Sequence, residues 1–167
     1  MAAGASPKAN NKSAIKPITL HCGVSMTATP PAGTNVVDQP ASQGNQYGPF
    51  RCPTKGFGGG IISDSFTVPD SGDTVGTYTQ YFHAGTITGA FDLTPLESSE
   101  PSSTNFTSQS WTGTITVTGG TGLYKGIVGK KNTGVLNCTS ADSVHITCTE
   151  KVKVKMTDIN ALVSTKA

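Results

Sequence analysis

Alternation of apolar and polar residues is the main regularity along this chain. It is clearest over residues 144–156, VHITCTEKVKVKM, where the even positions form an apolar row and the odd positions carry histidine, threonine and lysine. A period of two residues is that of a strand with one buried face. Residues 144–156 are therefore predicted to form a half-buried strand, and the buried row of this strand contains one carboxylate, Glu150.

Similar alternation and short apolar runs predict further strands, at residues 18–29, 61–68, 74–96, 106–120, 123–129 and 134–140. The 74–96 segment is too long for a single strand, and we expect it to turn near Ala84 and Gly85. No window has convincing helical periodicity. Roughly seven to nine short strands separated by turn residues indicate an all-β sandwich or barrel.

The chain of 167 residues is long enough for one domain with a real core. Residues 1–16 are small, polar and basic, and we interpret them as a disordered arm before a single domain at 17–157. A tail follows at 158–167. Residues 33–60 carry few apolar residues at regular spacing and are predicted to form a long loop. Loops of this length are uncommon in compact domains, so this one is either functional, for example as a lid, or hides a strand.

The charge of the chain excludes several classes of partner. Charged residues make up 13% of the sequence, below the roughly 25% of an average protein, and the net charge is only +2. Nucleic-acid binding needs a more concentrated positive field, so we expect no nucleic-acid partner. No apolar stretch approaches the length of a membrane span. The three histidines are scattered and no His/Asp/Glu cluster has ligand spacing, so no metal is expected.

Four cysteines permit three disulfide pairings. Proximity favours Cys138 with Cys148, because their segments resemble the two arms of one hairpin, and Cys22 with Cys52 then follows. An even count without a CxxC motif, in a chain poor in charge, indicates an oxidising compartment rather than a zinc site. We therefore expect a secreted or periplasmic protein. Asn105 and Asn137 lie in N-x-T sequons, whose glycosylation depends on the host.

One glycine-rich motif carries a family resemblance. Residues 111–129, WTGTITVTGGTGLYKGIVG, contain a strand that ends in GGTG, an aromatic residue at Tyr124 and a closing glycine at Gly129, and GTITGAFDLT precedes them. This pattern resembles the allene oxide cyclase and dirigent β-barrel superfamily, including its bacterial cyclase-like members. Ile127 and Val128 depart from the Ala-Arg usual before the last glycine. The resemblance covers about residues 61–155.

The resemblance implies an antiparallel eight-stranded barrel whose lumen holds a hydrophobic small molecule. Members of the superfamily cyclise or couple reactive intermediates without a cofactor, and they are often dimers or trimers, so a homo-oligomer is a possible state here. An eight-stranded barrel can fill itself with side chains or hold one small ligand, which agrees with this expectation.

Glu150 is the leading candidate for catalysis. A carboxylate in a dry lumen has a raised pKa, which suits a general acid or base. Alternatively, Glu150 lies near the barrel mouth, where it is hydrated or pairs with an arginine or lysine such as Arg51 or Lys55. Tyr81 and His83 share one strand face and could complete a proton-transfer set with Glu150, or could simply belong to the core. Aromatic residues expected to line the lumen and contact substrate are Tyr78, Phe82, Phe91, Trp111 and Tyr124.

Three functions remain open at this stage. The first is a secreted, cofactor-independent cyclase or isomerase that acts on a hydrophobic small molecule. The second is a non-catalytic barrel that binds such a molecule. The third is a structural surface domain with a fully packed interior. Fold resemblance alone does not decide among them.

Overall fold

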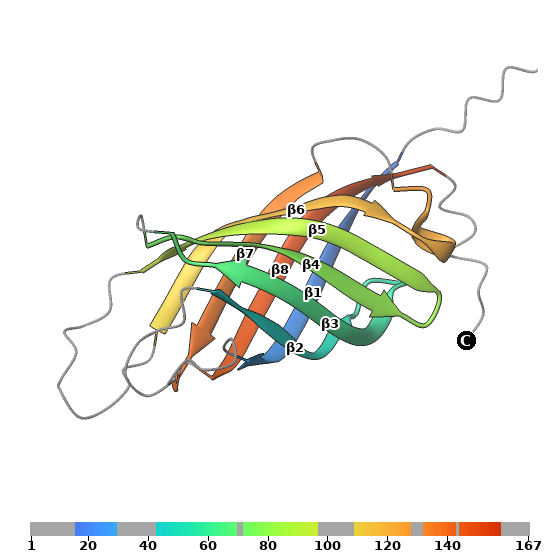
Figure 1. Ribbon diagram of the computed structural model, residues 1–167. Helices are drawn as coiled ribbons and strands as arrows, with labels where there is room; N and C mark the ends of the chain where they lie inside the picture. Colours follow the sequence, from blue (N-terminus) through green and yellow to red (C-terminus); the bar gives the residue numbers. More distant parts are fainter. Residues whose placement is uncertain are drawn as a thin grey trace, which may run out of the picture.

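The chain forms a closed antiparallel barrel of eight strands (Figure 1). The computed structural model describes residues 16–29, 43–69, 72–96, 109–127, 132–142 and 144–157. Each strand pairs with the next along the chain, and the last pairs with the first. The strands are β1 (Lys16–Thr29), β2 (Gln43–Cys52), β3 (Gly58–Thr67), β4 (Thr74–Phe82), β5 (Gly85–Pro95), β6 (Gln109–Gly120), β7 (Asn132–Ser140) and β8 (His145–Met156). The all-β, antiparallel eight-stranded barrel is thus confirmed.

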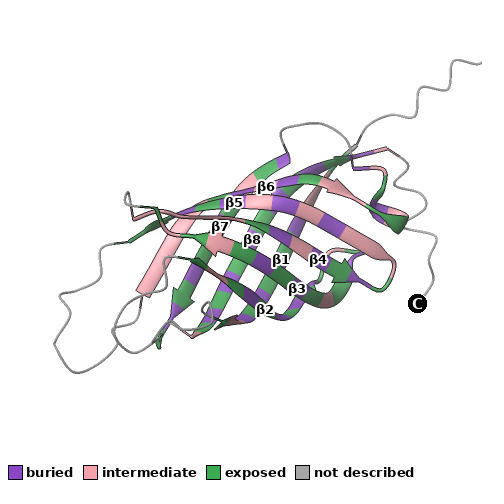
Figure 2. Ribbon diagram, in the orientation of Figure 1, coloured by how far each residue is buried: buried purple, intermediate pink, exposed green. Residues whose placement is uncertain are grey.

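Burial alternates along the strands, as the banded colours of Figure 2 show. In β8 every second residue from Ile146 to Met156 is buried, and the residues between them are exposed. Closure into a barrel gives every strand two partners, so no strand edge remains to pair with another chain. The buried rows meet inside the barrel and form its core.

Both predicted disulfides are confirmed. Cys22–Cys52 joins β1 to β2, and Cys138–Cys148 joins β7 to β8. The paired α-carbons are 4.1 Å apart in each case. All four cysteines are buried, so both disulfides belong to the interior of the barrel.

The expected long loop at 33–60 is wrong from residue 43 onward. Residues 43–52 form β2, and β3 already begins at Gly58. The inward positions of β2 include Gln46 and Gly48, while Tyr47 faces outward, so the usual contrast between apolar and polar faces is missing. Residues 33–42 lie outside the described part of the chain. Residues 1–15 of the expected arm and the whole expected tail at 158–167 also lie outside it.

The glycine-rich segment after β6 also differs from expectation. Residues 123–129 were expected to form a strand, but Gly122–Tyr124 form a 3-10 helix, η1, and Ile127 makes only an isolated bridge to Met156. Gly122 has φ of 57°, in the left-handed region that favours glycine. The expected turn near Ala84 and Gly85 is confirmed, since it separates β4 from β5.

An aromatic cluster fills the end of the barrel next to η1. The Tyr124 ring stacks on Phe57 with centroids 5.3 Å apart and lies 4.7 Å from Phe82. Phe82 also meets Phe50 edge to face at 4.7 Å. All four rings are buried, so they form the wall of the core at this end.

No helix within the described residues has the length and apolarity needed to cross a membrane.

Candidate functional site

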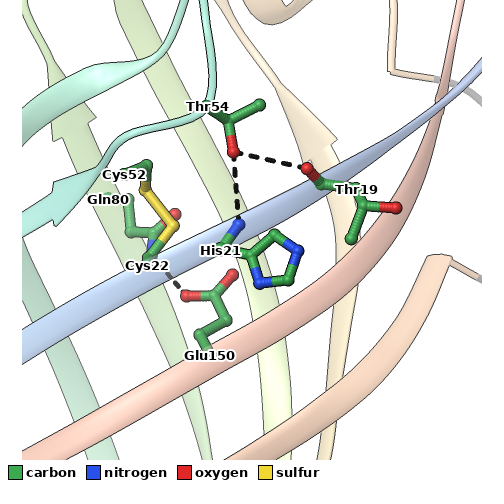
Figure 3. Close-up of a disulfide and its surroundings, with 7 residues drawn as sticks. All are labelled: Thr19, His21, Cys22, Cys52, Thr54, Gln80 and Glu150. Carbon is green, nitrogen blue, oxygen red and sulfur yellow. Dashed lines mark hydrogen bonds between the residues drawn. A yellow bond between two sulfur atoms is a disulfide. The ribbon is translucent and has the colours of Figure 1, made fainter.

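Glu150 lies inside the barrel, near the middle of β8, and only 3% of it is exposed. Its neighbours on the adjacent strands are Cys22 of β1 and Leu136 of β7. The Cys22–Cys52 disulfide therefore lies beside the carboxyl group (Figure 3). Near this disulfide, the Thr54 hydroxyl accepts a hydrogen bond from the His21 backbone N–H and donates one to the Thr19 carbonyl oxygen. These two bonds connect the β2–β3 turn to β1.

Gln80 reaches Glu150 from another part of the barrel wall. Its Nε2 donates a hydrogen bond to Glu150 Oε2 at 2.8 Å, and Gln80 is itself fully buried (Figure 3). β4 and β8 are not neighbours in the barrel, so the two side chains meet across its interior. Gln80 was not predicted as a site residue. The available signal was its position between Tyr78 and Phe82, two residues from each and on the same strand face.

The interior raises the pKa of Glu150. Burial disfavours the charged carboxylate and raises the pKa from 4.5 to about 7, although the Gln80 hydrogen bond acts in the opposite direction. The alternative in which Glu150 pairs with Arg51 or Lys55 is wrong, since both of those side chains are exposed and Gln80 is the partner of the carboxyl group. A carboxyl group with this pKa can act as a proton donor or a proton acceptor near neutral pH.

A second buried acid, Asp64, lies on β3 directly opposite Tyr78 of β4. Burial raises the pKa of Asp64 from 3.8 to about 7, and a hydrogen bond with the Gln46 backbone opposes part of this rise. The pKa of Tyr78 is raised by burial and further by the charge of Glu150. Tyr78 therefore lies next to Asp64 and also interacts electrostatically with Glu150.

Four buried oxygen atoms in this region have no hydrogen-bond partner among the described residues. They are Asp64 Oδ1, Tyr78 OH, Gln80 Oε1 and Glu150 Oε1. Buried polar atoms in folded proteins are nearly always hydrogen-bonded, because leaving one unpaired costs about 1–3 kcal/mol. The four atoms belong to β3, β4 and β8, and their side chains are the candidate site inside the barrel.

Tyr81 and His83 do not join this group. Tyr81 is 52% exposed and lies opposite Ile61 on the outer surface, and His83 is exposed in the turn after β4. The expectation that they face Glu150 is corrected by the direction of β4, which turns Tyr78, Gln80 and Phe82 inward. Aromatic residues occur on both faces of this strand, so hydrophobicity did not distinguish the two.

The residues expected to contact substrate are distributed along the barrel. Tyr78, Phe82, Phe91 and Tyr124 are buried, and Trp111 packs against the core while partly exposed. Of these, Tyr78 is the one linked to Glu150, whereas Phe82 and Tyr124 belong to the aromatic cluster at the barrel end. No group of three or more His, Cys, Asp or Glu residues in the described ranges could hold a metal ion.

No protein-family model, no curated protein and no solved structure matches the chain.

Proposed function

We propose that this protein is a secreted, cofactor-independent enzyme of the cyclase or isomerase type. It holds a hydrophobic small molecule inside the barrel and moves a proton on it with Glu150. The observation that carries the proposal is the Glu150 carboxyl group, which has one oxygen held by Gln80 and the other buried and unpartnered.

The chemistry of this carboxyl group suits the role. Gln80 holds one oxygen at 2.8 Å and so orients the group, which leaves Oε1 free to accept or donate a proton. The pKa of about 7 means that acid and base forms are both populated near neutral pH. The sequence resemblance to the allene oxide cyclase and dirigent superfamily supports the same reaction class, and the two disulfides support an oxidising compartment.

A non-catalytic binding barrel is the second candidate. It is favoured by the position of Tyr81 and His83 on the outside, which leaves Glu150 without a second general acid or base from that pair. The same unpartnered oxygens would then hold the polar end of a ligand without turnover. A purely structural domain is less well supported, since it gives those four oxygens no role.

A neutral probe tests the proton transfer directly. Nitrobenzisoxazole is small, flat and mostly apolar, and its isoxazole ring opens when a base removes the one C–H proton of that ring. The carboxylate takes the proton, the C–H electron pair forms the nitrile, and the N–O bond breaks to release a coloured cyanophenolate. We expect the protein to accelerate this reaction above an equal concentration of acetate, with a rate that rises with pH through about 7 and then levels off.

Glu150→Gln should lower that rate by at least about 100-fold, the usual scale of general base catalysis. Asp92→Asn is the matched control, because Asp92 is an exposed carboxylate on the outer face of β5, and this variant should retain the full rate. Far-ultraviolet circular dichroism checks that both variants fold. If Glu150→Gln does not fold, the wild-type pH profile decides the matter. A rate no higher than acetate, a profile without a midpoint near 7, or full activity in folded Glu150→Gln each contradict the proposal.

A further inference from the structure

The unpartnered atoms inside the barrel are all able to accept hydrogen bonds. Each of the four is an oxygen, from two carboxyl groups, one amide and one phenol. The amide nitrogen of Gln80 already donates one of its two hydrogens to Glu150. With the carboxyl groups ionised, the carboxylate and amide oxygens are acceptors only, whereas the Tyr78 hydroxyl can both donate and accept.

The charges of the interior point in the same direction. The buried polar or charged residues in the described part of the chain are Gln46, Asp64, Gln80, Asn132, Ser140 and Glu150. Two of these six are acids and none is a lysine, arginine or histidine. Buried carboxylates are stable only when a cation or several donors compensate them, and the buried protein groups described here supply no cation.

The four side chains form a continuous group. Asp64 lies directly opposite Tyr78, and Gln80 follows Tyr78 by two residues on the same face of β4. Gln80 contacts Glu150 through its amide, and the Glu150 charge acts on Tyr78. The four oxygens therefore come from three strands, β3, β4 and β8.

The surroundings of this group are apolar. Ile62 and Ile87 are the cross-strand neighbours of Gln80, and Cys22 and Leu136 are those of Glu150. Hard metal cations prefer six or more oxygen ligands and retain water, which such walls do not supply. An organic cation fits better, because its apolar part can pack against the aliphatic side chains while its charged nitrogen meets the oxygens.

We propose that the barrel interior takes a cationic amine, that is, a mostly apolar molecule with one protonated nitrogen bound by Asp64, Tyr78, Gln80 and Glu150. The inference rests on the proposed function in one respect, since both require a ligand to enter the barrel. It goes further by naming the class of molecule that the site selects.

Three probes of similar size but different charge test the selectivity. Phenethylamine is a cation near neutral pH, phenylethanol replaces the nitrogen with a neutral hydroxyl group, and phenylacetate carries the opposite charge. Calorimetric titration of the full-length protein at about pH 8, where both acids are largely ionised, should show the amine binding at least about tenfold more tightly than the alcohol. Phenylacetate should not bind measurably.

The pH dependence provides a readout that does not need a variant. Asp64, Tyr78 and Glu150 are the titratable groups that face this site, and two of them protonate near pH 7. Below about pH 7, protonation of each carboxylate that the amine requires should lower the amine affinity by up to about tenfold per pH unit. Glu150→Gln and Asp64→Asn should each weaken amine binding at least about tenfold, whereas Asp92→Asn should leave it unchanged.

Several results overturn the inference. They are equal or tighter binding of phenylethanol, preferential binding of phenylacetate, absence of amine binding at every pH, or stabilisation by calcium ions in place of the amine. The nitrobenzisoxazole assay separates this failure from that of the proposed function, because its substrate is neutral. Proton transfer without amine selectivity overturns only the amine inference, whereas failure of both assays overturns both proposals.

Discussion

The side-chain amide of Gln80 on β4 donates a hydrogen bond to the carboxyl group of Glu150 on β8, with 2.8 Å between Nε2 and Oε2. The two residues are 70 positions apart in the sequence and on strands that do not pair. This contact gives a buried acid a single donor, which lowers its pKa but does not cancel the effect of burial. Several properties of the protein should therefore respond to changes at this pair.

Gln80→Met should raise the pKa of Glu150 above its value of about 7, because the variant keeps the length of the side chain and removes the donor that favours the carboxylate. The measurement is a pH titration of the Glu150 side-chain carboxyl carbon by NMR, with Glu150→Gln used to assign the signal. An unchanged or lower pKa would show that the hydrogen bond does not act on Glu150 in solution.

Stability should decrease as the pH rises from about 4 to about 7. Glu150 and Asp64 have folded pKa values of about 7, above their ordinary values of 4.5 and 3.8, so the folded state binds more protons than the unfolded state in this range. Their stabilising contribution is complete below the unfolded pKa values and is lost as the pH passes through the folded values. The loss should be of order a few kcal/mol for the two acids together.

Urea unfolding at intervals across this range provides the measurement. The double variant Glu150→Gln, Asp64→Asn is the control, and its stability should change much less between these pH values. Asp142 acts in the opposite sense but at lower pH, since hydrogen bonds from His145 and Val144 hold the pKa of its carboxyl group well below its usual range. Wild-type stability that rose between pH 4 and 7 relative to the double variant would contradict the raised pKa values.

The two disulfides should differ in how much they stabilise the fold. Cys22–Cys52 spans 30 residues and Cys138–Cys148 spans 10, and the entropy removed from the unfolded chain grows with loop length. Replacing each pair by alanines should cost about 4 kcal/mol for the first and about 3 kcal/mol for the second. Urea unfolding of both double variants at about pH 4 checks the order, and a larger loss for the shorter loop would contradict the entropic account.

Gly89→Ala should destabilise the barrel and displace Tyr78. A Cβ at Gly89 would lie 2.6 Å from the Tyr78 ring and would also clash with the Thr116 carbonyl oxygen, so the backbone has to shift. We expect a loss of about 1–3 kcal/mol from overpacking. Gly119→Ala is the matched control, because its nearest neighbour would be Thr88 Oγ1 at 3.6 Å. Equal stability of the two variants would argue against close packing of Tyr78 on Gly89.

Strand faces could be predicted from the sequence only where apolar and polar residues alternate clearly. In β8 the local alternation was sufficient to place Glu150 on the buried face, because the apolar residues around it share one parity. In β2 the same reasoning failed, since the inward row contains Gln46 and Gly48 and the outward row contains Tyr47. In β4 aromatic residues lie on both faces, so the inward position of Gln80 and the outward position of Tyr81 could not be distinguished.

Local periodicity was therefore enough to predict a sandwich or barrel of about seven to nine strands and the buried position of Glu150, because both depend on neighbours within a strand. Hairpin proximity predicted the Cys138–Cys148 disulfide and left Cys22–Cys52 as the other pair, whereas the eight-stranded barrel was implied by the resemblance of residues 111–129. The partner of that carboxyl group depends on closure of the barrel. Closure brings β4 and β8 to opposite sides of one narrow interior, where Gln80 and Glu150 meet and Asp64 and Tyr78 lie nearby. Contacts between residues so far apart arise from the curvature and stagger of the whole sheet, which no short sequence pattern encodes.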